Sequence, residues 1–243
     1  MLNKKICCMK NVLNNDCLSK FKITTSRRGR LTRSHIKAIE EFYPVFCIPF
    51  QHKVLDFVKI FCRVAPICIE IGFGTGENLL HIARQYSEIN FVGIEVYWPG
   101  IAVCLKKVNL MNLKNLRIIC YNACDVMKFM ISDNQIQYIQ LLFPDPWPKR
   151  KHQHRRIIEP GFLLLLGNKL KKYGILQIST DWESYAVDII NYVKQIKCFL
   201  YCNNMNQDEL ISRIETKFEI KGKKLGHKIF DLVFQYIGGK NFF

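Results

Sequence analysis

The chain has 243 residues, of which 49% are hydrophobic and 23% are charged, and these proportions argue against a disordered or collagen-like protein. With 36 lysines and arginines against 20 acidic residues, the net charge of +16 favours a polyanionic partner, although a basic surface that serves only solubility is the alternative. The 11 cysteines are scattered and form no CxxC pair, which is typical of a reduced, cytoplasmic protein and not of a secreted disulfide framework. No apolar run approaches the roughly 18 residues that a membrane helix needs.

Residues 1–30 lack a clear periodicity and end in the basic run TTSRRGRLTR. We expect them to form a flexible basic arm, whose contact with RNA the sequence leaves open. A helix is expected near residues 32–42, and the proline-broken stretch FYPVFCIPF that follows is expected to be irregular. The ordered core is then expected to begin near residue 53, within a single domain that spans residues 31–243.

Apolar runs typical of strands alternate with amphipathic stretches typical of helices along this domain. The strand-like runs are 66–71, 89–95, 116–121, 136–143 and 174–180. The amphipathic stretches are 77–87, 99–112, 125–131, 160–172 and 182–196. This alternation predicts an α/β fold with a mostly parallel central sheet, in which runs such as IQYIQLLF are covered by helices on both faces.

Ligands of such sheets bind beyond the carboxyl ends of the strands, so the residues that follow each apolar run are candidates. Gly72, Gly74 and Gly76 follow the first run and allow backbone to approach a ligand closely, although a mere turn is the alternative. Glu95 ends the second run. It lies about 20 residues after the glycines, the sequence separation at which a carboxylate meets ribose hydroxyls in such folds. Glu77 stands where a dinucleotide fingerprint has glycine, and its charge would oppose a pyrophosphate. A cofactor with a ribose but no phosphate at this point is therefore expected.

S-adenosylmethionine meets that description, and the pattern ExGxGxG, which begins at Glu70, resembles the first motif of the class I methyltransferases. The resemblance implies a Rossmann-like fold, with Glu70 near the methionine end of the cofactor and Glu95 at the ribose. It also places Asn122, after the third strand, near the adenine amino group. The amide oxygen of Asn122 can accept a hydrogen bond from that group.

The stretch FPDPWPK at 143–149 follows the fourth predicted strand, where class I methyltransferases place the atom that is methylated. Amino-directed methyltransferases carry a similar [DN]PP[YFW], but here one proline precedes the aspartate. Together with RR, STDW and TKFEIKGKKLGH, all in order, FPDPW resembles the tRNA (guanine-N7-)-methyltransferase family of the bacterial TrmB type. The resemblance covers about residues 67–236. It implies S-adenosylmethionine-dependent methylation of guanosine N7 in the tRNA variable loop, and a sheet that a C-terminal strand completes in antiparallel orientation.

Asp145 is the candidate catalytic residue, and it also belongs to the cofactor site. Guanine N7 carries a lone pair and no proton, so the reaction needs no strong base. We therefore expect Asp145 to orient the base and to favour the cation that forms on it. Trp147 either packs against the base or seals the loop.

The resemblance implies further contacts with the substrate. The candidate substrate-binding residues are Lys149, Asp181, Thr216, Lys217, Phe218 and Glu219. The candidate RNA-binding residues, next to the FPDPWPK stretch, are Arg150, Lys151, His152, His154, Arg155 and Arg156. Two of these expectations compete with structural roles: Asp181 is suited to cap the helix that follows it, and Phe218, like Phe234, is suited to the core.

Two other functions remain open at this point. One is an amino-directed methyltransferase that acts on N6 of adenine or N5 of glutamine, and the other is a noncatalytic RNA-binding protein with a relic cofactor pocket. No metal is expected, since the HQH at 152–154 has no cysteine or carboxylate at ligand spacing. No membrane is expected either, because the chain lacks a long apolar run. The sequence leaves monomer and homodimer equally open.

Overall fold

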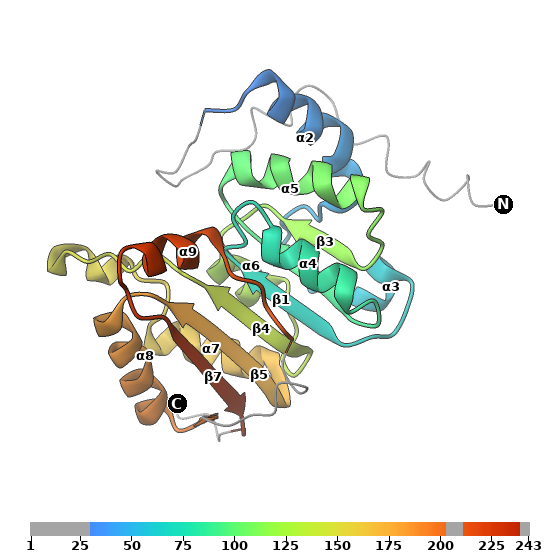
Figure 1. Ribbon diagram of the computed structural model, residues 1–243. Coiled ribbons are helices and arrows are strands. Elements are labelled where there is room, and N and C mark those ends of the chain that lie inside the picture. Colours follow the sequence, from blue (N-terminus) through green and yellow to red (C-terminus); the bar gives the residue numbers. More distant parts are fainter. Residues whose placement is uncertain (1–29, 203–210, 239–243) are drawn as a thin grey trace.

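The computed structural model describes residues 30–202 and 211–238, and its central feature is one twisted sheet (Figure 1). The strand order is β3-β2-β1-β4-β5-β7-β6. Strands β1 to β5 are parallel to one another, and β7 runs antiparallel to β5 and β6. The strands are β1 (Ile67–Ile71), β2 (Asn90–Ile94), β3 (Leu116–Ile119), β4 (Ile136–Leu142), β5 (Leu170–Thr180), β6 (Phe199–Tyr201) and β7 (Phe230–Tyr236). The predicted mostly parallel sheet with an antiparallel C-terminal strand is confirmed.

Helices cover both faces of the sheet, as predicted (Figure 1). One face packs against α3 (Phe57–Phe61), α6 (Ala123–Phe129), α7 (Pro160–Lys169) and α8 (Glu183–Ile196). The other packs against α2 (Arg33–Phe46), α4 (Glu77–Gln85) and α5 (Trp98–Leu110). A short 3-10 helix, η2 (Arg150–Arg155), and α9 (Lys217–Lys224) lie at the edge of this layered core.

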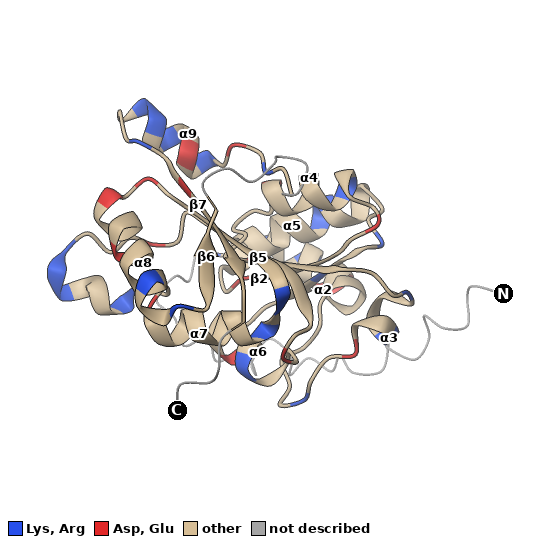
Figure 2. Ribbon diagram, turned by 90° about the horizontal axis from the view of Figure 1, so that it is seen from below, with Lys and Arg blue, Asp and Glu red and all other residues tan. Residues whose placement is uncertain are grey.

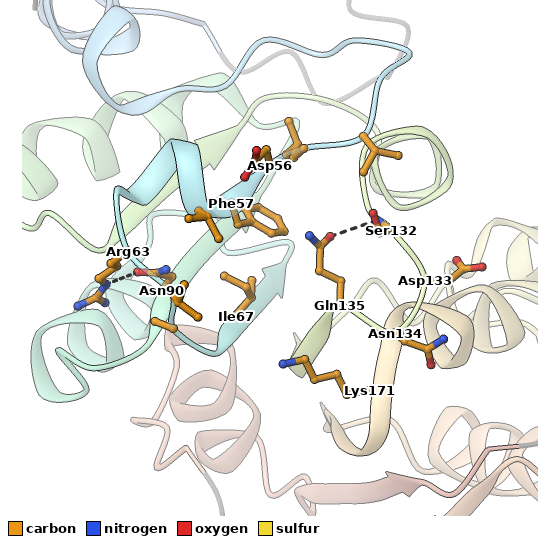
Figure 3. Close-up of a pocket in the computed structure, with 15 residues that line it drawn as sticks. Asp56, Phe57, Arg63, Ile67, Asn90, Ser132, Asp133, Asn134, Gln135 and Lys171 are labelled. Carbon is orange, nitrogen blue, oxygen red and sulfur yellow. Dashed lines mark hydrogen bonds between the residues drawn. The ribbon is translucent and has the colours of Figure 1, made fainter. Parts of the chain in front are cut away.

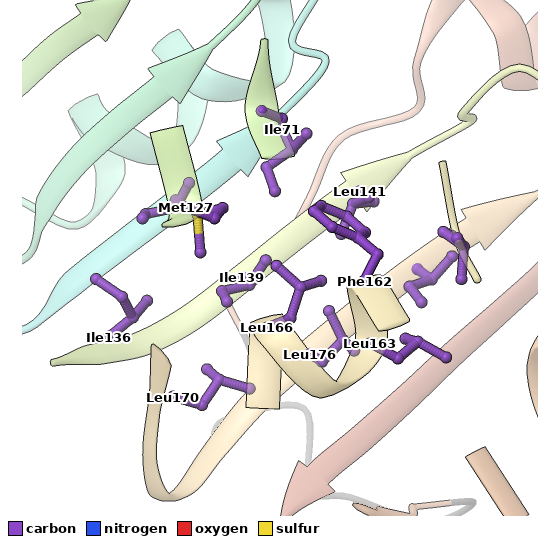
Figure 4. Close-up of a cluster of buried hydrophobic side chains, with 14 of the residues drawn as sticks. Ile71, Met127, Ile136, Ile139, Leu141, Phe162, Leu163, Leu166, Leu170 and Leu176 are labelled. Atoms are coloured by element: carbon purple, nitrogen blue, oxygen red, sulfur yellow. The ribbon is translucent and has the colours of Figure 1, made fainter. Parts of the chain in front are cut away.

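The apolar runs of the strands are explained by burial on both faces. In β1, Ile67, Ile69 and Ile71 belong to the cluster beneath α6 and α7, whereas Cys68 belongs to the cluster beneath α4 and α5. Figure 4 shows the first cluster, in which Phe162 and leucines of α7 lie against the apolar side chains of β4 and β5. At roughly 25 cal/mol per Å² of apolar surface, such burial is the main stabilising contribution to a fold of this kind.

The structure corrects the expectations for the N-terminal part of the domain. Helix α2 continues through Pro44 to Phe46, where an irregular segment was expected. Pro44 lacks only the hydrogen bond to the carbonyl of Glu40, and the Cys47 N–H still bonds to Tyr43. Ala38, Ile39 and Phe46 are buried. The ordered core therefore begins before residue 53, whereas the expected basic arm lies outside the described residues except for Arg30.

One boundary and two further elements differ from the sequence-based expectation. The helical stretch at 160–172 ends at Lys169, and strand β5 already begins at Leu170. Strand β6 was not expected. Helix α9, at residues 217–224, was not expected either.

Candidate active site

The glycine loop after β1 has the geometry that its sequence predicts. Gly72, Gly74 and Gly76 have φ values of +77°, +59° and +78°, in the left-handed region that favours glycine. A Cβ atom placed on Gly72 or Gly74 would meet nothing within 4 Å. The loop therefore borders open space at the carboxyl end of the sheet, where backbone can approach a ligand.

Glu95, directly after β2, holds this loop in place. Its Oε2 accepts a hydrogen bond from the Gly74 N–H at 2.8 Å, and its Oε1 accepts from the N–H groups of Val96 and Tyr97. Glu95 is half-buried, and its Oε2, which among the described residues accepts from Gly74 alone, can accept a second donor such as a ribose hydroxyl. The structure thus places Glu95 against the glycine loop.

Glu77 occupies the first turn of α4, where a pyrophosphate would bind in a dinucleotide site. Its carboxylate forms ion pairs with Lys217 at 2.8 Å and Lys107 at 3.5 Å, and it accepts a hydrogen bond from Thr75. Partial burial alone would raise the pKa of Glu77, but these partners lower it below its usual range. A negative charge at this helix start supports a cofactor without phosphates.

Glu70 lies inside β1, beneath the loop, and is only 3% exposed. Its Oε2 accepts a hydrogen bond from Asn78 Nδ2 at 2.9 Å. Burial raises the pKa of Glu70 to about 7, against the lowering effect of that hydrogen bond. Burial therefore favours the neutral form of this carboxyl over the carboxylate.

Glu70 belongs to a buried polar network that sequence reasoning missed. Asn78 Nδ2 also bonds to Gln140 of β4, and Gln140 Nε2 bonds to Gln177 of β5 at 2.9 Å. Glu70, Gln140 and Gln177 are in register on adjacent strands. The signal was present in the sequence, since each of the three interrupts an apolar run.

Asn122 follows β3, as expected, but it has a structural role in addition to any contact with a cofactor. Its Oδ1 accepts hydrogen bonds from the N–H groups of Cys124 and Asp125, so it is the N-cap of α6. The side chain is exposed at the same end of the sheet as the glycine loop.

The FPDPWPK loop follows β4 and is braced on both sides. The Phe143 N–H bonds to the Ser179 carbonyl of β5, and the Pro146 carbonyl accepts from Arg156 Nε at 2.8 Å. Phe143 and Trp147 have φ values of +52° and +42°. Each such conformation costs roughly 1–2 kcal/mol in a non-glycine residue, and strain of this kind is concentrated at functional sites. The half-buried Asp145 lies between these two strained positions.

The basic residues at 149–156 differ in their exposure to solvent. Lys149, Arg150, Lys151, His154 and Arg155 are exposed, and His152 is half-buried. The ring of Trp147 organises this segment, because the Arg155 guanidinium lies 5.0 Å from its centroid and the His152 ring 5.9 Å from it.

Arg156 differs from its neighbours because it is buried. Its guanidinium also forms an ion pair with Asp188 at 2.6 Å and lies over the ring of Tyr185. Arg156 therefore holds the Pro146 carbonyl by a hydrogen bond, whereas the exposed cations of this segment can face a polyanion.

Asp181 follows β5, and its carboxylate faces His227, with Oδ2 at 3.1 Å from Nδ1. The expected alternative role as a helix cap is wrong, since α8 begins after Trp182 and has no side-chain cap. The N–H of Trp182 bonds to Thr180 Oγ1 instead.

Helix α9 carries the four residues of the TKFE block. Thr216 caps the helix by accepting a hydrogen bond from the Glu219 N–H. Glu219 is buried and forms ion pairs with Arg213 and Lys223, so its carboxylate anchors α9. Phe218 is 61% exposed, and the expectation that it belongs to the core is wrong, whereas Phe234 is fully buried as expected.

Arg213 is a second feature that sequence reasoning missed. Its half-buried guanidinium binds Glu219 of α9 and Asp231 of β7 and lies 5.9 Å from the centroid of the Phe143 ring. It thereby ties α9, β7 and the FPDPWPK loop together. Its surrounding sequence, SRIE, gives no sign of this role.

A cavity of about 510 Å³ opens at the opposite end of the sheet (Figure 3). It lies at the amino ends of the strands, beside Ile67 and Asn90. Two hydrogen bonds join polar groups of its lining, Arg63–Asn90 and Gln135–Ser132. Because ligands of parallel sheets bind at the carboxyl ends, we place the candidate active site there and not in this cavity.

The described residues contain no group of three or more possible metal ligands. Within the same part of the chain, the helices are too short or too polar to cross a membrane.

Known proteins resemble this chain over most of its length. The family model described as "Putative methyltransferase" matches residues 64–232. A tRNA (guanine-N(7)-)-methyltransferase of Buchnera aphidicola is 45% identical over 211 residues, which cover 86% of this chain and 88% of that protein. One of Klebsiella pneumoniae is 39% identical over 224 residues, which cover 90% of this chain and 93% of that protein. Among solved structures, the 16S rRNA methyltransferase KamB has a TM-score of 0.55 at 11% identity, covering 76% of this chain and 94% of its own. That last likeness concerns the fold alone.

Proposed function

Because the chain belongs to the tRNA (guanine-N7-)-methyltransferase family, we propose that it methylates N7 of a guanosine in the tRNA variable loop, with Asp145 at the reacting centre. The enzyme is an S-adenosylmethionine-dependent tRNA methyltransferase. The observation that carries the more specific proposal is the strained, braced loop that holds Asp145 at the carboxyl end of β4, beside the glycine loop of β1.

The residues at the carboxyl ends of β1, β2 and β3 fit the cofactor. Gly72 and Gly74 leave open space beside the backbone, Glu95 can accept from ribose hydroxyls, and Asn122 lies at the third strand end. Glu70 is the buried carboxyl nearest to the loop on β1. When bound, S-adenosylmethionine supplies an electrophilic methyl group.

Asp145 acts by charge and position in this proposal. Guanine N7 attacks with its lone pair, so no residue needs to remove a proton first. Methylation leaves a positive charge on the purine, and a fixed carboxylate favours that charge as it develops. The hydrogen bonds that hold Phe143 and Pro146 fix the loop before the substrate arrives, so little reorganisation is needed.

The tRNA backbone has two groups of cations available at this end of the molecule. Figure 2 shows lysines and arginines on α9 and on the segment beside α8, which contains η2. The exposed lysines of α9 include Lys217, Lys221 and Lys224. Phosphate contacts of this kind supply affinity and make it dependent on salt. We further infer that the enzyme acts in the cytoplasm.

The proposal is tested by incubating the purified protein with labelled S-adenosylmethionine and unmodified tRNA, followed by nucleoside analysis. We expect the label in 7-methylguanosine. Label in N6-methyladenine or methylglutamine would favour an amino-directed enzyme, and tRNA binding without cofactor binding would favour a noncatalytic protein.

The role of Asp145 is tested by Asp145→Asn, which keeps the shape of the side chain and removes its charge. We expect turnover to fall about 10²-fold, in the range found when one stabilising group is removed from an active site. Asp56→Asn, at the opposite end of the sheet, is the matched control and should keep its turnover. Unchanged turnover in Asp145→Asn would contradict the role.

A further inference from the structure

A cavity of about 500 Å³ lies between the start of α8 and the turn that joins α9 to β7. Asp181 and Trp182 line it from the carboxyl end of β5, and His227 and Lys228 line it from the turn. This volume is in the range of pockets that bind small organic groups. Strand β5 pairs in parallel with β4, so the carboxyl end of β5 lies beside the end of β4 that leads into the Asp145 loop (Figure 1).

Two residues fix the carboxylate of Asp181 in this cavity. His227 Nδ1 lies 3.1 Å from Oδ2. On α9, a Cβ atom added to Gly222 would lie 2.8 Å from the same oxygen, so only glycine leaves room for this orientation. The His227 N–H also bonds to the Gly222 carbonyl, which ties the two residues to each other. Among the described residues, none hydrogen-bonds to Oδ1, which is left for a ligand.

We infer that His227 is a positioning residue that, with Gly222, sets Asp181 to accept hydrogen bonds from the Watson–Crick edge of the target guanine. Guanine presents N1–H and N2–H donors on that edge, and an ionised carboxylate only accepts. Adenine presents an unprotonated N1, which a carboxylate repels. A base without the N2 amino group would leave part of this pairing unmade, and sites of this type discriminate strongly against such analogues.

This inference rests on the proposed function and extends it to the selection of the base. The two carboxylates at neighbouring strand ends then have different tasks. Asp145 favours the charge that forms during transfer, and Asp181 holds the base by its opposite edge. The orientation of Asp181 depends on residues of α9 and the following turn, and this polar helix is anchored to β7 through Arg213 and to α4 through Lys217.

The test compares tRNA transcripts that carry guanosine or inosine at the methylated position, since inosine lacks the N2 amino group. We measure kcat/KM for each transcript with wild-type protein, His227→Ala, His227→Asn and Gly222→Ala. His227→Ala should lower kcat/KM on guanosine about tenfold and bring the ratio of guanosine to inosine toward one. In His227→Asn, the amide nitrogen replaces Nδ1 as a donor and should restore most of both values. His81→Ala, exposed on α4, is the control and should change neither.

Gly222→Ala provides a second route to the same result. Alanine favours a helix more than glycine does, so this variant should fold, while its Cβ displaces the Asp181 carboxylate. It should therefore lose the preference for guanosine as His227→Ala does. If His227→Ala and Gly222→Ala both keep the wild-type ratio, the inference is overturned and the proposed function stands. If the wild-type protein forms no 7-methylguanosine, both are overturned.

Discussion

The side-chain oxygen of Asn78 accepts a hydrogen bond, at 3.1 Å, from the backbone N–H of Ile214, a residue that follows it by 136 positions. The same side chain donates to Glu70 on β1. A buried amide on α4 thus joins the sheet beneath the cofactor loop to the segment that leads into α9. Since that segment also carries Arg213, Asn78 connects the two halves of the site.

We therefore predict that Asn78→Ala lowers the free energy of unfolding by about 2–4 kcal/mol, because it leaves the buried Glu70 carboxyl and the Ile214 N–H without this partner. Urea denaturation measures the change. Asn109→Ala, exposed near the end of α5, should cost less than about 0.5 kcal/mol. A loss for Asn78→Ala no larger than that of the control would show that the network contributes little.

The second prediction concerns pH and Glu70. Its pKa of about 7 in the folded protein lies above the ordinary value of 4.5, so the folded state binds this proton more tightly than the unfolded chain does. The resulting stability is present below about pH 4.5 and is lost as the pH rises toward 7. Glu70→Gln stays neutral and can still accept from Asn78. Its advantage in unfolding free energy should grow across this window, by up to roughly 3 kcal/mol.

Denaturation of both proteins at pH 5 and pH 8 measures that advantage. The exposed Glu88→Gln is the matched control and should show nearly the same difference from wild type at both values. An advantage of Glu70→Gln that does not increase with pH would mean that burial perturbs this carboxyl far less than its surroundings suggest.

The sheet could be predicted because its determinants are local and repetitive. Runs such as IQYIQLLF are buried on both faces, and glycines at left-handed φ mark the loop after β1. Helix α9 could not be predicted in this way. Its buried residues are Glu219 and Gly222, while Phe218 and Ile220 are exposed, which reverses the pattern that identifies an amphipathic helix.

The candidate site was predictable to the extent that strand ends determine it. Gly74, Glu95 and Asn122 lie where their order along the chain places them. The contact between Asp181 and His227 joins residues 46 positions apart, with α8, β6 and α9 between them, and no local pattern specifies it. Likewise, Arg156 looks like its basic neighbours in sequence, and only the fold buries it against Tyr185.

That difference between Arg156 and its neighbours gives the third prediction. Arg150→Ala removes an exposed cation at the start of η2, so it should weaken tRNA binding and reduce the slope of log K against log salt by about one, with the turnover of bound tRNA unchanged. Arg156→Met removes the buried partner of the Pro146 carbonyl and should have the opposite profile. Its salt slope should match wild type, while turnover falls at least tenfold, because the loop that carries Asp145 loses its brace. Filter binding over a range of salt and single-turnover methylation measure the two quantities. If Arg156→Met instead lowers the salt slope and leaves turnover intact, Arg156 binds a phosphate and does not brace the loop.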